Sequence, residues 1–152
     1  MNILQGLLTI NGIDPYVEYG VFLAFEEGED PMTNYSALLT APELKEPRKV
    51  EFRELNGVKL PAKLTQRWKE REFTLKFCIE AANKAQFEER YFGFLNFLKD
   101  GADGWLTISL SELSRSWRVY MRKLKPYKQL TDFNGGVAAI FSIVFEEPSP
   151  NF

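Results

Sequence analysis

Hydroxyls, one thiol and carboxylates are the side chains in this 152-residue sequence that could support catalysis, and none has a base beside it. The sequence contains no histidine, which removes the commonest general base near neutral pH. Ser111, Ser114 and Ser116 therefore lack the activating partner that a nucleophilic serine needs. Cys78 is the only cysteine and falls inside a strand pattern, so we expect an inert side chain rather than a nucleophile.

Acidic residues are the remaining candidates for chemistry. Glu88 and Glu89 are adjacent on an expected helix and point in different directions, so they do not form a carboxylate pair. Four further acids, between residues 26 and 30, lack the spacing and the glycine of an EF-hand calcium loop. They are Glu26, Glu27, Glu29 and Asp30. We expect a solvated loop there, and we predict no enzymatic activity, no metal and no cofactor.

Composition and charge limit the possible partners. A net charge of −2 and a pI near 5.4 do not suit a polyanion-binding protein. The most basic run, residues 115–128, alternates with apolar residues and indicates a strand with one solvated or interface-facing side. A second basic and aromatic set either stacks across neighbouring strands or contacts a ligand or subunit. Its members are Arg67, Trp68, Arg71 and Trp117.

The chain length suits one domain, spanning residues 1–152. Residues 1–16 lack the basic region and long apolar run of a signal peptide. No stretch approaches 18 uninterrupted apolar residues, so we expect no transmembrane helix and no membrane contact. The single cysteine excludes an intramolecular disulfide.

Two elements in the middle of the chain are the clearest. Residues 71–79 alternate strictly, with Phe73, Leu75, Phe77 and Ile79 on one face, which predicts a strand of a sheet covered on one side. An amphipathic helix is predicted over residues 84–99, with Asn83 as its N-cap and Gly101 just past its end. Its apolar stripe consists of Phe87, Tyr91, Phe94, Leu95 and Leu98. Phe92 and Phe97 lie to the sides of that stripe and either widen the contact or face another subunit.

The other strands are shorter or less regular. Strands are predicted near residues 7–10, 19–25, 50–53, 105–110 and 117–121, and residues 58–64 are expected to lead into the strand that follows them. The run 137–145 predicts a strand buried on both faces. Asn11-Gly12 and Asn56-Gly57 are turn signals. The result is a mainly β (α+β) fold: an antiparallel β-sandwich or barrel-like sheet of about seven to eight strands with one flanking helix.

Residues 26–49 form a long loop or arm with three prolines and little periodicity. Tyr35, Leu38 and Leu39 are more apolar than a solvated loop favours. We therefore expect this segment either to stay mobile or to become ordered on a neighbouring subunit.

The order of elements resembles tail proteins of long-tailed bacteriophages. The resemblance lies in the segments WKEREFTLKFCIEA, FLNFLKDGADGWLTISL, SRSWRVYMRKLKPY and GGVAAIFSIVFEEPSP. The N-terminal domain of distal tail proteins, which shares its fold with tail tube proteins, is most similar. The likeness covers roughly residues 50–150. The chain is shorter than a full distal tail protein and lacks a counterpart of its peripheral domain, so a short version, a tube protein and another small tail component all stay open.

The resemblance implies a structural protein of a phage or prophage virion tail, assembled in the bacterial cytoplasm. It implies a homo-oligomer, a hexameric ring around a channel, with other tail proteins as neighbours and DNA passing through without specific binding. A long loop near the start would reach the neighbouring subunit. The candidate interface residues are Tyr35, Leu38, Leu39, Phe92, Phe97, Arg118 and Tyr120. The alternatives are a monomeric β-sandwich module that binds carbohydrate or peptide through Trp68, Trp105 and Trp117, and an enzyme, which would need a pocket of carboxylates with strongly shifted pKa values.

Overall fold

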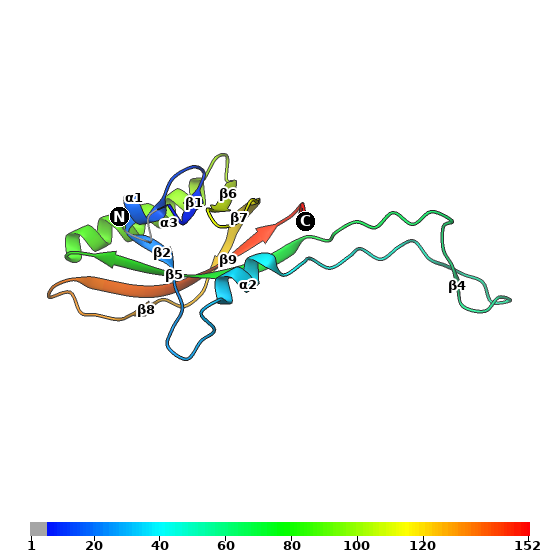
Figure 1. The fold of residues 1–152 in the computed structure, drawn as a ribbon, viewed down its shortest axis with the longest axis horizontal. Coiled ribbons are helices and arrows are strands. Elements are labelled where there is room, and N and C mark those ends of the chain that lie inside the picture. Colours follow the sequence, from blue (N-terminus) through cyan, green and yellow to red (C-terminus); the bar gives the residue numbers. More distant parts are fainter. Residues whose placement is uncertain (1–5) are drawn as a thin grey trace.

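The strands form one curled antiparallel sheet and a small separate pair, in a computed structural model that describes residues 6–152 (Figure 1). The large sheet follows the order β1-β6-β7-β9-β5-β2, and β8 pairs with β9 beside this path. Its strands are β1 (Leu8–Ile10), β2 (Val21–Leu23), β5 (Arg71–Ala81), β6 (Leu106–Leu110), β7 (Ser116–Leu124), β8 (Lys128–Gln129) and β9 (Val137–Glu147). The separate pair is β3 (Val50–Glu51) and β4 (Val58–Lys59), and the helices are α1 (Pro15–Tyr19), α2 (Thr33–Leu39) and α3 (Lys84–Asp100).

The two longest strands, β5 and β9, form the centre of the sheet. They pair along their whole length, from Arg71 beside Glu147 to Ala81 beside Val137. The alternation predicted for β5 is confirmed, because all four of its predicted inward side chains are buried. β9 differs from the prediction of burial on both faces. Most of the β9 residues that point to the outer side of the sheet are only half-buried, because α3 packs on the inner side and not on the outer side.

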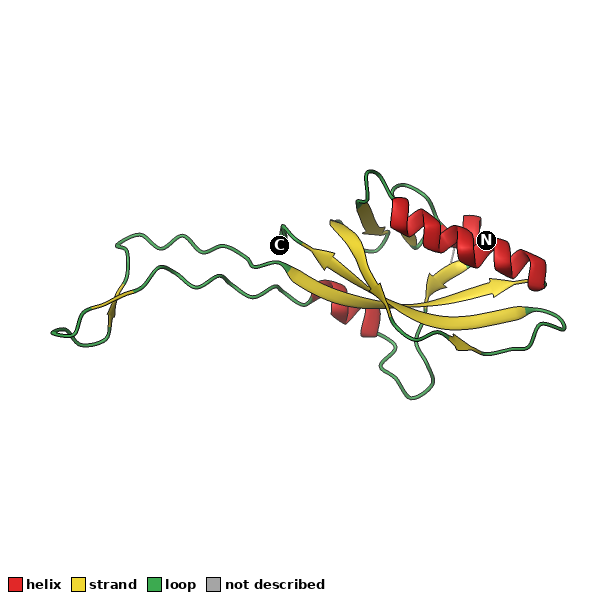
Figure 2. Cartoon of the chain, turned by 180° about the vertical axis from the view of Figure 1, so that it is seen from behind, coloured by secondary structure: helices red, strands yellow, loops and turns green. Residues whose placement is uncertain are grey.

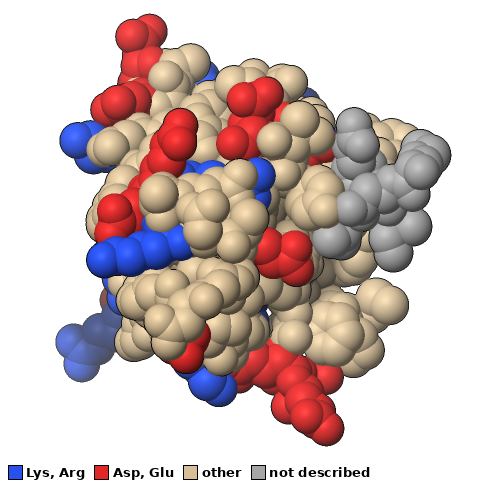
Figure 3. Space-filling view, turned by 90° about the vertical axis from the view of Figure 1, so that its left-hand side faces the viewer, with Lys and Arg blue, Asp and Glu red and all other residues tan. Residues whose placement is uncertain are grey.

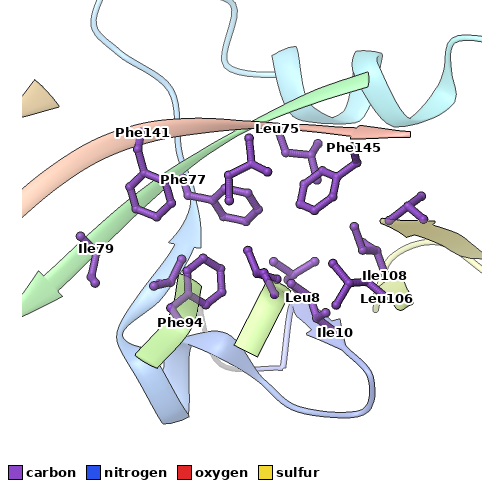
Figure 4. Close-up of a cluster of buried hydrophobic side chains, with 14 of the residues drawn as sticks. Leu8, Ile10, Leu75, Phe77, Ile79, Phe94, Leu106, Ile108, Phe141 and Phe145 are labelled. Atoms are coloured by element: carbon purple, nitrogen blue, oxygen red, sulfur yellow. The ribbon is translucent and has the colours of Figure 1, made fainter. Parts of the chain in front are cut away.

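Strand β7 bends the sheet into two halves. Its first residues pair with β6, its last residues pair with β9, and the register shifts between Met121 and Lys123. Such a bulge increases local twist. The inner faces of the two halves therefore meet, and Figure 4 shows Leu8 and Ile10 opposite Phe77 and Phe145.

Helix α3 covers the open side of this curled sheet (Figure 2). Its predicted limits are confirmed: the Asn83 side chain accepts a hydrogen bond from the Gln86 amide at 2.9 Å, and Gly101 follows the last turn with a φ of 49°. A Cβ on Gly101 would lie 2.5 Å from the carbonyl oxygen of Trp105. Phe87, Phe94 and Leu98 of the predicted stripe are fully or almost fully buried.

Three short elements differ from the expectations. Helices α1 and α2 and strand β8 were not predicted, because five-residue, seven-residue and two-residue elements show no readable period. For α1 a local signal exists: Asp14 accepts a hydrogen bond from the Tyr16 amide, and Pro15 occupies the first turn. The predicted strand over residues 19–25 shortens to β2 as a result.

Helix α2 lies inside the segment 26–49 that was predicted to be a loop. Its Asn34 side chain donates to the Ala24 carbonyl at 3.0 Å and accepts from the Lys76 amide at 2.8 Å. The side-chain amide of Asn34 thus makes a hydrogen bond to the β5 backbone just beyond the end of β2. Helix α2 packs beside β5.

The mainly β architecture with a flanking helix is confirmed. Within residues 6–152, no helix has the length and apolar character needed to cross a membrane.

Candidate assembly interface: the arm and its root

Residues 41–70, here called the arm, project from the body as a long two-stranded extension (Figures 1 and 2). At the base, the Lys45 amide donates to the Arg67 carbonyl at 2.8 Å, and the Lys69 amide donates to the Glu43 carbonyl at 2.7 Å. Near the tip, β3 pairs with β4 around the predicted Asn56-Gly57 turn, where Gly57 has a φ of 71°. The arm leaves the body where β5 begins.

The arm exposes apolar side chains along its whole length. Seven large apolar residues of the arm are at least 40% exposed: Leu44, Val50, Phe52, Leu55, Val58, Leu60 and Leu64. At the tip, a hollow of about 280 Å³ is lined by Arg48, Val50, Phe52, Lys59, Leu60 and Pro61. When another protein surface covers this much exposed apolar surface, the free energy of the system falls, so binding is favoured.

The arm and the rest of the chain carry opposite net charges. The arm has eight Lys and Arg against five Glu, a net +3, and the remaining residues have 11 Lys and Arg against 16 Asp and Glu, a net −5. Figure 3 views the body from the end away from the arm, where both kinds of charge surround uncharged surface. Opposite net charges favour contact between the arm of one copy and the body of another.

Arg71 joins the two roots of the arm. Its backbone continues directly from the arm into β5, and its Nη1 donates to the Thr40 carbonyl at 2.7 Å, at the other root. Its Nε donates to the Glu147 carboxylate at 2.7 Å, and both side chains are more than 90% buried. The guanidinium lies between the rings of Phe73 and Phe152, at 4.7 and 4.6 Å from their centroids.

The predicted contact residues on α2 take three different positions. Leu39 is exposed beside the arm root, and Tyr35 is half-buried against the core, where burial and the nearby Glu112 raise its pKa. Leu38 is 0% exposed and belongs to the core of the chain itself. Its side chain is therefore not on a surface that a neighbouring subunit could contact, which corrects that part of the interface prediction.

On α3, Phe92 is 57% exposed, whereas Phe97 stacks on Tyr19 with ring centroids 5.5 Å apart. On β7, the guanidinium of Arg118 lies 4.4 Å from the centroid of the Trp105 ring. The Tyr120 hydroxyl donates to Glu146, a hydrogen bond that raises the pKa of Tyr120. The structure thus does not gather the predicted contact residues into one patch.

The side chains considered for catalysis take different positions. Burial raises the pKa of the Cys78 thiol to about 11, so the nucleophilic thiolate is scarce at neutral pH. Lys76 holds Glu29 at 2.7 Å and lowers the pKa of that carboxyl, and Lys128 lies 3.5 Å from Glu26. Ser114 lines a hollow of about 730 Å³ with five other residues, and none of the six is an acid.

The three tryptophans do not form one exposed face. Trp117 is only 2% exposed and belongs to the core, whereas Trp105 stands edge-on to Tyr120 at 6.0 Å and Trp68 stands edge-on to Phe152 at 6.2 Å. The arrangement favours contacts within the chain over a sugar-binding aromatic platform.

Sequence reasoning missed the true extent of the arm and the role of Arg71. The arm begins about 15 residues later than the predicted segment 26–49 and continues to Glu70. The arm is marked in the sequence only by the turn residues Asn56 and Gly57 between two weakly alternating stretches. The same pattern is typical of two ordinary paired strands. The side-chain hydrogen bonds of Arg71 join residues 31 to 76 positions apart, and no local pattern records them.

Comparisons with known proteins give a distant likeness among solved structures. No family model matches the chain, and no curated protein does. Among solved structures, the chain is similar to the SPP1 Dit (gp 19.1) protein, which is described as a paradigm of the hub adsorption apparatus in phages that infect Gram-positive bacteria. The match has a TM-score of 0.49 and 14% identity, and covers 93% of this chain and 50% of that one.

The chain therefore spans about half the length of that protein. A likeness this distant assigns no function.

Proposed function

We propose that this chain is a structural tail protein of a phage or prophage, without catalysis, that assembles with its own copies into a closed ring. In this proposal the arm of each copy binds the next copy. The ring is expected to be a hexamer around a channel through which DNA passes without specific binding, with other tail proteins above and below. The ring would be assembled in the bacterial cytoplasm and reside in the virion tail.

The observation that carries the proposal is the arm. It holds seven exposed large apolar side chains on a segment that projects away from the body. Ordering a backbone costs roughly 1–2 kcal/mol per residue, and an extension with few packed contacts offsets little of that cost. A partner surface supplies the missing burial.

The length of the arm supports a neighbouring copy as that partner. Thirteen positions separate Leu44 from Gly57, so the arm can reach at most about 45 Å. A compact body of about 120 residues has a radius of gyration of about 14 Å, which corresponds to a diameter of roughly 35 Å. An arm whose greatest reach is comparable to the diameter of the body can lie across a neighbour, and such a head-to-tail contact forms a ring when its rotation closes.

The test is the assembly state with and without the arm. Residues 46–66 are replaced by a two-glycine linker, which keeps the hydrogen-bonded base and removes the tip. Light scattering coupled to size exclusion and negative-stain microscopy should show rings for the intact chain and monomers for the shortened one. Because the core lies outside the arm, the melting temperatures of the two bodies should agree within a few degrees.

The control is a substitution that leaves the arm length unchanged, Lys63→Gln, which should still give rings. A strictly monomeric intact chain at millimolar concentration would refute the proposal. Rings formed equally well by the shortened chain would show that the body alone assembles.

A further inference from the structure

Charge separates sharply along the first half of the sequence. Residues 1–44 contain seven Asp and Glu and no Lys or Arg, whereas residues 45–69 contain eight Lys and Arg and three Glu. The second segment is most of the arm. The first includes α1, β2, α2 and the connection between β2 and α2, together with arm residues 41–44. Its body part, residues 1–40, has six Asp and Glu and no Lys or Arg, and is thus opposite in charge to the arm.

The acidic connection, residues 25–32, is here called the acidic turn, and its hydrogen bonds fix its shape. The Glu26 amide donates to the Glu29 carboxylate at 2.6 Å, and the Glu29 amide donates to the Glu26 carbonyl at 3.0 Å. Lys76 on β5 holds the Glu29 carboxylate at 2.7 Å. Asp30 accepts from the Met32 amide at 2.9 Å. The turn is therefore an ordered feature of the body.

The acidic turn presents both apolar and acidic groups to solvent. Phe25 at its start is 49% exposed, and Met32 at its end is 57% exposed. Lys76 and Lys128 neutralise Glu26 and Glu29. The ion pairs within residues 6–152 include neither Glu27 nor Asp30, so two exposed carboxylates remain beside two exposed apolar side chains.

Among residues 6–152, no further strand pairs with the outer edge of β2, which adjoins the turn. β2 ends the path of the large sheet. Gly20 and Ala24 make the ladder hydrogen bonds to β5, which by antiparallel alternation turns the peptide groups of Val21 and Leu23 away from the sheet. An extended segment of another chain can pair with such an edge.

We propose that the acidic turn of one copy is the docking site for the arm tip of a second copy. The hollow at the arm tip has an apolar lining that includes Val50 and Phe52, with Arg48 and Lys59 beside it. An apolar hollow with two cations complements the acidic turn, in which the exposed Phe25 ring is followed by the carboxylates of Glu27 and Asp30. Phe25 enters the hollow, and the Arg48 and Lys59 cations face Glu27 and Asp30. The inference rests on the proposed function, because it requires that copies assemble through the arm.

The experiment is a charge swap between the two surfaces. The receptor variant carries Glu27→Lys and Asp30→Lys, and the arm variant carries Arg48→Glu and Lys59→Glu. Each should weaken assembly at least about 100-fold in analytical ultracentrifugation, because like charges face each other across the contact. The chain with all four substitutions should recover assembly to within about tenfold of the unmodified chain, because the pairs are restored in reverse.

A further variant tests the apolar half of the contact. Phe25→Ala should weaken assembly about tenfold or more, as for an interface anchor, whereas Phe133→Ala, which removes another exposed ring, should have no effect. The matched charge control is Glu88→Lys with Glu89→Lys on α3, which should assemble normally. Melting temperatures confirm that every variant is folded.

The outcomes separate this inference from the proposed function. If the unmodified chain forms rings and the receptor variant assembles equally well, the acidic turn is not the docking site, although the ring proposal stands. The same holds if the four substitutions together restore nothing, or if only the α3 control loses assembly. If the unmodified chain forms no assembly, both proposals fail.

Discussion

Arg71 is the residue on which the base of the arm depends. It connects the first residue of β5, the end of α2 at Thr40 and the end of β9 at Glu147. Its Nη2 is buried without a hydrogen-bond partner among the described atoms, so the guanidinium relies on one carboxylate, backbone carbonyls and two aromatic faces. A buried cation held in this way is sensitive to the loss of its counter-charge.

We predict that Glu147→Gln lowers the free energy of unfolding by about 3 kcal/mol, because it leaves the Arg71 charge buried without a carboxylate. Urea denaturation measures the change. The matched control is Glu72→Gln, which breaks the pair with Arg122; both of those side chains are more than a third exposed, and the cost should stay below about 1 kcal/mol. Equal costs for the two substitutions would contradict a structural role for the buried pair.

At the scale of elements, α3 shows how a helix is fixed by its ends and by one face. The Asn83 cap, the Gln86 side chain that accepts from the Ala82 amide at 2.6 Å, and Gly101 set its limits. Its buried face rests on aromatic contacts: the Phe94 ring lies 5.9 Å from Phe77 and 6.1 Å from Phe141. Figure 4 shows Phe94 pointing toward Phe77 of β5 and Phe141 of β9.

Phe94→Ala should lower the free energy of unfolding by about 3–5 kcal/mol, because the lost ring leaves a cavity in a fully buried site. Chemical denaturation again measures it. Phe92→Ala, two positions earlier and largely exposed, should change stability by no more than about 0.5 kcal/mol. A cost below about 1 kcal/mol for Phe94→Ala would mean that the stripe does not face the core.

The whole molecule consists of a well-packed body and an arm that is not packed against it. Body strands β5 and β9 are hydrogen-bonded along their full length. The arm has ladder hydrogen bonds at its base and at β3 and β4. Because the arm has fewer backbone hydrogen bonds than the body, we expect it to open locally at a lower cost in free energy than the body.

We therefore expect amide hydrogen exchange between residues 46 and 66 to be fast in a dilute monomer and strongly slowed after assembly. The amides of β5 should be protected in both states and serve as the internal control. Arm exchange that stays fast in isolated rings would show that the neighbour does not cover the arm.

The sequence by itself determined the elements whose signals are local. The alternation of residues 71–79, the stripe and caps of residues 84–101 and the strands near 105–110 and 137–145 were all predictable, because backbone period and end-capping depend on residues a few positions apart. These elements were enough to predict a mainly β fold with a flanking helix.

Only the tertiary structure decided which residues are available to a partner. Leu38 and Leu39 are neighbours of the same type, yet one is fully buried and the other is half exposed. Likewise the arm at 41–70 and an ordinary pair of core strands have similar sequence patterns. The physical reason is that burial and ion pairs such as Arg71 with Glu147 depend on segments distant in the sequence, and local periodicity carries no record of where those segments meet.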